Sequence, residues 1–193
     1  MLTSSSTSSK LLTLVRQHDS EGWRRFVEIY APLIYSWSRA ASVNAADAGD
    51  VTQEVLAKVF SAIEDFRHDR PHDTLRGWLR VIWRNKLTDH FRALANNPMA
   101  AGGSDAQARL AMVSTDDDQS SVLSDRQTLA RKVAELVRDE FEPRTWQAFW
   151  MIVTEEYTAA EAAAALDMSV GAARQAKYMV LRRLRDELSG EFD

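Results

Sequence analysis

Apolar residues recur at spacings of three and four along most of this sequence, from Lys10 to Ala95 and again from Asp125 onward. This is the period at which one face of an α-helix becomes buried. The 193 residues include only seven Gly and four Pro, which leaves little of the turn-forming material that a β protein needs. The sequence therefore predicts an all-α fold.

The helical pattern is interrupted between residues 96 and 124. This stretch contains an Asn-Asn-Pro sequence, an Ala-Gly-Gly-Ser sequence and an acidic run at 115–121, without a sustained apolar period. We interpret it as a flexible acidic linker. The predicted organisation is a disordered tail at 1–9, a helical domain at 10–95, the linker at 96–124 and a second helical domain at 125–193.

The fourth helix of the first domain, which we expect to begin after an N-cap at Thr74, has an irregular apolar pattern. At 3.6 residues per turn, Leu87 and Phe91 are rotated away from Leu75, Leu79 and Ile82. The pattern predicts either a bend in this helix or apolar side chains that face outward.

Composition and motifs argue against several classes of protein. The absence of cysteine excludes disulfides and thiolate metal sites. No apolar run approaches the roughly 20 residues of a membrane helix, and the polar N-terminus lacks a signal-peptide core. The histidines lack carboxylate partners at ligand spacing, although His68 and His72 are a weak candidate metal pair, and no phosphate loop or nucleophile motif occurs. We therefore expect a cytoplasmic protein without membrane insertion, metal, cofactor or enzymatic activity.

The segment from Thr158 to Arg174 has the pattern of a helix-turn-helix. Thr158 and Ser169 are each suited to cap the start of a helix, and a tight turn is expected at Asp167-Met168. Five basic residues and no acidic one occur from Ser169 to Arg185, in a chain with a formal net charge of −4. This distribution suits contact with DNA phosphates, and the alternative is an ordinary solvated helix face.

Two stretches of the first domain combine polar and aromatic residues in ordered patterns. Asp50, Gln53 and Glu54 form a polar patch on one helix, suited to a basic partner surface. From Arg76 to Arg92, basic residues are interleaved with aromatic ones, the combination that binds unpaired bases. The alternative is that the aromatic residues are simply core. Helical spacing favours that alternative for Trp78 and leaves it open for Trp83.

These motifs resemble those of the extracytoplasmic-function (ECF) sigma factors of the sigma-70 family. The patterns D-x-x-D-x-x-Q-E from Asp47 and G-W-L-x-x-I-x-x-N-x-x-x-D-H-x-R from Gly77 are similar to sigma region 2. The helix-turn-helix is similar to sigma region 4. The resemblance covers about residues 10–95 and 125–188. It implies a sigma factor that binds core RNA polymerase and directs promoter recognition, promoter melting and transcription initiation.

The resemblance also implies three groups of site residues, each matched position by position. The group that would bind the coiled coil of the polymerase β′ subunit is Asp47, Asp50, Gln53, Glu54 and Lys58. The group that would bind the −10 element is Arg76, Arg80, Trp83, Arg84, Asn85, Lys86, His90 and Arg92, with Asn85 at a captured base. The group that would bind the −35 element is Ser169, Gly171, Ala172, Arg174, Gln175, Lys177, Tyr178 and Arg182. Of these, Arg174, Gln175 and Tyr178 would enter the major groove.

Further partners follow from the same resemblance. Lys177, Arg182 and Arg183 are expected at DNA phosphates or at the polymerase β flap, and an anti-sigma factor is an expected partner that no residue identifies. The sequence departs from the family at Gly49, where an acidic residue is frequent. Small residues at Ala163 and Ala173 predict thin packing in region 4. The residues expected to supply bulk there are Trp146, Phe149, Trp150 and Met168.

Two other functions are compatible with parts of the pattern. A free-standing helix-turn-helix regulator would use the C-terminal domain on duplex DNA and has no need of the patch at Asp50, Gln53 and Glu54. A helical protein–protein adaptor would use the basic helix as a face for an acidic partner, and it would not be retained by DNA at low salt.

Overall fold

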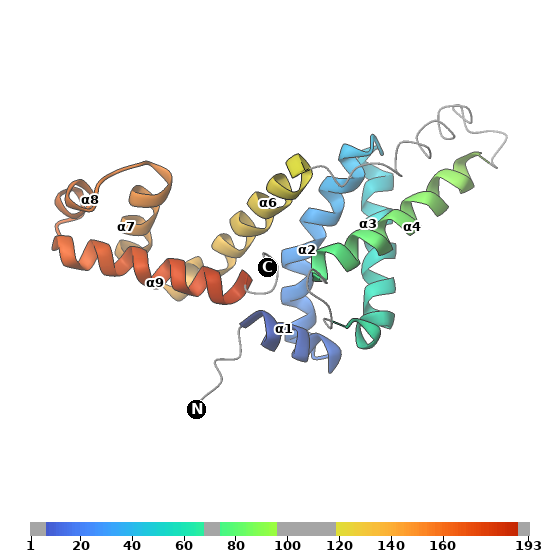
Figure 1. Ribbon diagram of the computed structural model, residues 1–193, viewed down its shortest axis with the longest axis horizontal. Coiled ribbons are helices and arrows are strands. Elements are labelled where there is room, and N and C mark those ends of the chain that lie inside the picture. Colours follow the sequence, from blue (N-terminus) through green and yellow to red (C-terminus); the bar gives the residue numbers. More distant parts are fainter. Residues whose placement is uncertain (1–6, 68–73, 96–118, 189–193) are drawn as a thin grey trace. The chain divides into compact units, whose positions relative to one another are not determined.

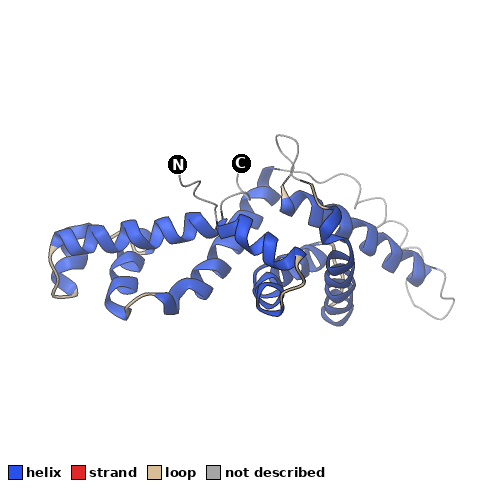
Figure 2. Ribbon diagram, turned by 90° about the horizontal axis from the view of Figure 1, so that it is seen from below, coloured by secondary structure: helices blue, strands red, loops and turns tan. Residues whose placement is uncertain are grey.

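The computed structural model describes residues 7–67, 74–95 and 119–188, and every regular element in these ranges is helical (Figures 1 and 2). This confirms the prediction of an all-α fold. The chain divides into two compact units, of which one contains Ser9–Leu129 and the other Ala130–Ser189. Most of the expected tail and linker lies outside the described residues. Residues 7–9, assigned to the tail, and residues 119–124, assigned to the flexible linker, are helical.

The first unit is built on the helices α1 (Thr7–Arg16), α2 (Ser20–Ala40), α3 (Ala45–Ala62) and α4 (Leu75–Ala95), with a 3₁₀ turn, η1 (Ile63–Asp65), after α3. Polar side chains begin three of these helices. Asp19 Oδ2 accepts a hydrogen bond from Gly22 N at 2.7 Å, and Asn44 Oδ1 accepts one from Asp47 N at 2.9 Å. Thr74 Oγ1 accepts from Gly77 N at 3.0 Å, as expected for the cap of α4.

The core of the first unit lies among α2, α3 and α4, with α3 packed against both of the others (Figure 1). Each helix contributes one apolar face, as its spacing predicts. Fully buried side chains at the centre are Phe26, Leu33, Ile34, Val51, Val55, Val59, Leu79, Leu87 and Phe91.

Helix α4 resolves the irregular apolar pattern in a way that the sequence did not suggest. Leu75, Leu79, Trp83, Leu87 and Phe91 are all buried. They follow one another at a spacing of four. Because four residues are slightly more than one helical turn, each side chain is rotated a little around the helix axis from the one before it. Leu87 and Phe91 therefore do not face outward, because α2 and α3 together cover a row that changes direction along the helix, whereas Val81 is 56% exposed.

Gly22 allows α1 to approach the start of α2. A Cβ at this position would lie 2.5 Å from Leu14 Cβ and 3.2 Å from the Leu14 backbone carbon, so Gly22→Ala must displace α1. We expect this change to lower the free energy of unfolding by about 1–3 kcal/mol. Gly49→Ala on α3 is the matched control, since a Cβ there meets nothing within 4 Å. It should raise stability by about 0.5–1 kcal/mol. Urea unfolding followed by circular dichroism measures both, and equal stabilities would contradict this account.

The second unit contains the end of α6 (Gln119–Val137), η2 (Arg138–Glu140), α7 (Pro143–Thr154), α8 (Ala159–Ala165) and α9 (Val170–Leu188). Helix α9 packs against α7 and α8. Ala162, Ala163, Ala173 and Ala176 are buried at these contacts, so the thin packing expected from small residues is present. Of the residues expected to add bulk, Phe149 is buried, whereas Trp150 remains 40% exposed and does not fill the contact.

Candidate functional site

A polar surface on α3 contains five of the predicted site residues, and we name it the α3 patch: Asp47, Asp50, Gln53, Glu54 and Lys58. Spacings of three and four place Asp47, Asp50, Glu54 and Lys58 along one side of the helix. Asp47 is half-buried and the other four are exposed. Three carboxylates and one ammonium group make this side of α3 acidic. Gly49 has no side chain, and no other group lies within 4 Å of where its Cβ would be.

Two of the predicted −10 residues on α4 are paired with the α3 patch. Lys86 Nζ lies 3.4 Å from Glu54 Oε2, and His90 Nε2 lies 3.5 Å from Asp47 Oδ2. Because α3 and α4 pack side by side, the acidic side chains of one helix meet the basic side chains of the other. Two groups that the sequence assigned to different partners are therefore in direct contact.

The remaining predicted residues of α4 differ in exposure. Asn85 and Arg92 are exposed, and Arg84 is half-buried. Trp83 is only 6% exposed, and its Nε1 donates a hydrogen bond to Ser38 Oγ at 3.0 Å. Its ring also packs on Trp37, with centroids 5.6 Å apart. Trp83 therefore belongs to the core, and its prediction as a DNA contact is corrected because no face of the ring is free for a base.

Trp78 is the more accessible of the two tryptophans on α4. It is half-buried and packs on Phe66, with ring centroids 5.2 Å apart. The two rings help to line a pocket of about 300 Å³, together with Asp65, Arg67, Thr74, Gly77 and Val81. An aromatic wall beside an arginine is suited to a planar, polar ligand such as a base. The sequence pattern did not single out this pocket because its walls come from two separate segments.

Arg76 and Arg80, predicted at the −10 element, are engaged within the protein. Both guanidinium groups contact Asp125 Oδ2, at 2.9 Å from Arg76 and 3.1 Å from Arg80. Asp125 Oδ1 accepts a further hydrogen bond from Trp37 Nε1 at 2.7 Å. We name these four residues the Asp125 cluster. Asp125 is 4% exposed, although the sequence analysis placed it at the start of the second domain without a role.

On the second unit, all eight predicted −35 residues are exposed: Ser169, Gly171, Ala172, Arg174, Gln175, Lys177, Tyr178 and Arg182. They occupy the start and the outer side of α9. Ser169 Oγ accepts a hydrogen bond from Ala172 N at 3.1 Å, which fits its predicted role as a cap. Val170 at the start of α9 is 37% exposed and extends this outer surface.

Helix α8 begins with the capping box expected at Thr158. Thr158 Oγ1 accepts from Glu161 N at 3.2 Å, and Glu161 Oε2 accepts from Thr158 N at 2.7 Å. Hydrogen bonds from the Thr158 side chain and backbone lower the pKa of Glu161. Residues 166–169 then connect α8 to α9, with Asp167 in the left-handed region at φ 50°. The cap and this turn fix how α9 follows α8.

Arg183 was expected at a phosphate or at polymerase, and in the structure it is half-buried and paired with two carboxylates of the same unit. Its guanidinium donates two hydrogen bonds to Glu140, at 2.6 and 2.9 Å, and one to Glu187 at 2.6 Å. Burial acts to lower the pKa of Arg183, but the hydrogen bonds to Glu140 and Glu187 outweigh it and raise the pKa. An arginine held by two carboxylates links η2 to α9 and has little capacity left for DNA.

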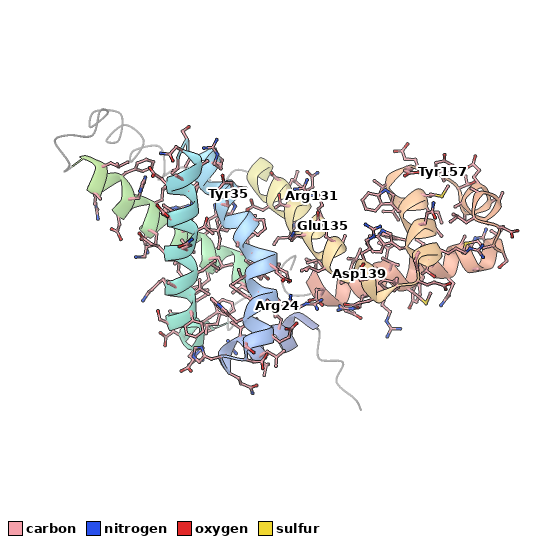
Figure 3. The ribbon with its side chains drawn as sticks, turned by 180° about the vertical axis from the view of Figure 1, so that it is seen from behind. Arg24, Tyr35, Arg131, Glu135, Asp139 and Tyr157 are labelled. Carbon is pink, nitrogen blue, oxygen red and sulfur yellow. The ribbon has the colours of Figure 1, made fainter. Side chains whose placement is uncertain are left out.

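A second pocket, of about 640 Å³, lies between α6 and α7 in the second unit. Its apolar wall includes Phe141, Trp146 and Trp150. Charged residues at its edge include Arg131, Glu135 and Asp139, which follow one another at a spacing of four (Figure 3). The exposure of Trp150 noted above is explained by this wall.

Other kinds of site find no support in the part of the chain that the structure describes. Within residues 7–67, 74–95 and 119–188, no group of three or more His, Cys, Asp or Glu side chains is arranged to hold a metal ion. None of the described helices combines the length and the apolar character needed to cross a membrane.

Residues 26–96 match the family model of sigma-70 region 2. This range includes most of α2 and all of α3 and α4, and therefore the α3 patch, the Trp78 pocket and Asn85. No curated protein matches the chain.

Proposed function

We infer from the match of residues 26–96 to sigma-70 region 2 that this chain is a sigma-70 family sigma factor, with a role in RNA polymerase binding and promoter recognition. The observation that carries this inference is the coincidence of the matched range with the two facing helices. The acidic side of α3 and the basic residues of α4 lie in one small domain. Such a domain suits a protein that joins a polymerase to a nucleic acid.

We further propose that the α3 patch binds the coiled coil of the polymerase β′ subunit. Exposed carboxylates at Asp50 and Glu54 offer charge to a basic partner surface, which accelerates association and selects the partner. The resemblance to ECF sigma factors supports this choice of partner. The same resemblance supports a cytoplasmic location and regulation by an anti-sigma factor.

On α4 we propose that Asn85 contacts an unpaired base of the −10 element. Asn85 is exposed, and an amide both donates and accepts hydrogen bonds, as recognition of a base edge requires. Arg84, Lys86 and Arg92 surround it with positive charge for the DNA backbone. The Trp78 pocket offers a second place for a base to stack, and Trp83 is not part of this surface.

For the second unit we propose a helix-turn-helix made of α8 and α9 that reads the −35 element. The exposed side of α9 presents Arg174 and Gln175, which have bidentate reach to guanine and adenine. Lys177 and Arg182 are suited to phosphates. The resemblance of the sequence to ECF sigma factors supports this assignment of α8 and α9 to a region 4.

Run-off transcription tests the proposed function directly. Purified core RNA polymerase is supplied with this protein on a library of genomic promoters, and the start sites are mapped. We expect start sites that appear only with the protein and share two spaced elements. Sequence-specific binding to duplex DNA without any binding to core polymerase would instead establish a free-standing regulator.

Replacing Asn85 should separate promoter opening from polymerase binding. Asn85→Ala removes an exposed amide without disturbing the core, so affinity for core polymerase should be unchanged. The loss of one hydrogen-bonded base contact costs about 1 kcal/mol, or roughly a fivefold drop in open complexes. Permanganate footprinting measures the open complex. Gln17→Ala, which removes an exposed amide from the same unit, is the control, and equal footprints for the two variants would exclude Asn85 as a base contact.

A further inference from the structure

The Asp125 cluster is a buried anion held by cationic and polar donors. The Asp125 carboxylate accepts hydrogen bonds from Trp37 Nε1, Arg76 and Arg80, and its side chain is 5% exposed. The Arg76 and Arg80 side chains are 14% and 12% exposed. A carboxylate is stable at such a depth only because each oxygen is satisfied by a donor.

The Asp125 cluster places two cationic groups around a single carboxylate. One carboxylate faces two guanidinium groups, and the Arg80 guanidinium also lies 5.1 Å from the centre of the Trp37 ring. Two arginines and an indole N–H make a rigid donor set for any oxyanion, and arginine in particular matches phosphate geometry. The donors come from α2 and α4, whereas the acceptor comes from α6. The site is therefore built by region 2, and Asp125 is its occupant.

The position of this site on α4 indicates a nucleic-acid ligand. Arg76, Arg80 and Arg84 follow one another at a spacing of four, so they form one basic row along the helix. The row ends beside Asn85, which we propose to hold a base of the −10 element. A DNA strand with a base at Asn85 therefore has the row available for its phosphates, and Asp125 occupies the first two members.

We propose that Trp37, Arg76 and Arg80 form a phosphate-binding site for promoter DNA, and that Asp125 is an internal competitor that must leave before DNA can enter. This proposal rests on the proposed function of the −10 surface and adds a means of regulating it. The first residues of α6, 119–129, act as a cover that is displaced when DNA binds. Free protein is then held in a state of low affinity for DNA.

Binding of a fluorescein-labelled single strand to the full chain, followed by anisotropy, tests the proposal. Asp125→Asn keeps the shape and an acceptor for Trp37 but removes the charge that competes with phosphate. If Asp125 covers the site about nine-tenths of the time, removing it tightens binding roughly tenfold. Glu28→Gln is the matched control, because it removes one surface charge on α2 and leaves Arg24 its second partner, Glu21. Arg76→Gln added to Asp125→Asn should abolish the gain.

A structural readout accompanies the affinities. Hydrogen–deuterium exchange of residues 119–129 should rise when the strand is added to the wild-type protein, and Asp125→Asn should show the raised exchange without DNA. Circular dichroism and thermal unfolding of each variant verify that region 2 remains folded. Should Asp125→Asn unfold, exchange in the wild-type protein still decides the question.

The possible outcomes separate this proposal from the proposed function. Equal affinities for wild type, Asp125→Asn and Glu28→Gln would overturn the competitor role while run-off transcription still succeeds. A gain for Asp125→Asn without any polymerase-dependent transcription would support the phosphate site and overturn the sigma factor assignment. Tighter binding to core polymerase without tighter binding to DNA would assign the site to a carboxylate of the polymerase, and the DNA proposal would be wrong.

Discussion

Asp50→Lys is expected to weaken binding of the protein to core RNA polymerase by about 2–5 kcal/mol, because it places a like charge against a basic surface. Asp50 is exposed at the middle of the α3 patch. A lysine at this position therefore has room, and we expect the fold to be unaffected. Affinity is measured with labelled protein and purified core enzyme. The loss should be greatest at low salt, since screening weakens both the original attraction and the new repulsion.

A charge reversal elsewhere in the same unit controls for the change in net charge. Glu28→Lys on α2 makes the same change outside the α3 patch, and Arg24 keeps Glu21 as a partner. Its affinity for core polymerase should remain near that of wild type. Similar losses for Asp50→Lys and Glu28→Lys would mean that polymerase responds to overall charge, and the α3 patch would not be the docking surface.

Arg174→Ala is expected to weaken binding to duplex DNA that carries the −35 element by about 1–3 kcal/mol and to relax the choice of base at one position. Arg174 is exposed at the start of α9, where a helix in the major groove reaches base edges. Its removal leaves Ala173 and Ala176 buried as before, so α8 and α9 keep their packing. Binding to a library of substituted −35 sequences measures both the affinity and the preference.

Lys177→Ala is the control for Arg174→Ala, because it distinguishes loss of a phosphate contact from loss of a base contact. Lys177 is also exposed on α9, and we propose that it contacts phosphate. Its loss should weaken binding to all sequences alike and reduce the salt slope by about one. If Arg174→Ala instead lowered every affinity by the same factor, Arg174 would be a phosphate contact, and base readout would have to be assigned to Gln175 or Tyr178.

Local signals in the sequence predicted much of this fold. The caps at Thr74 and Thr158 could be predicted because a short polar side chain directly before an apolar helical run is typical of a helix N-cap. The exposed side of α9 followed from helical periodicity in the same way. Such features depend on residues within one or two turns of each other, which is the range that a spacing argument covers.

The features that sequence reasoning missed depend on contacts between distant segments. Trp78 and Trp83 have similar neighbours in the sequence, yet Trp83 is buried because Trp37 and Ser38 of α2 lie against it. The role of Asp125 depends on two arginines 45 and 49 positions away. No helical period relates residues so far apart in the sequence. The start of α6 was assigned to the linker because it follows an acidic run that lacks apolar residues.

On the proposed function, the Lys86–Glu54 ion pair and the neighbouring His90–Asp47 contact predict a thermodynamic linkage between polymerase and DNA. A polymerase that engages the carboxylates of Glu54 and Asp47 draws them away from Lys86 and His90, which lie 3.4 and 3.5 Å from them. The released groups then favour an anionic strand, so polymerase raises the affinity for DNA. By reciprocity, DNA raises the affinity for polymerase by the same factor. We therefore expect assembly on a promoter to be cooperative, with neither partner alone obtaining the full binding energy.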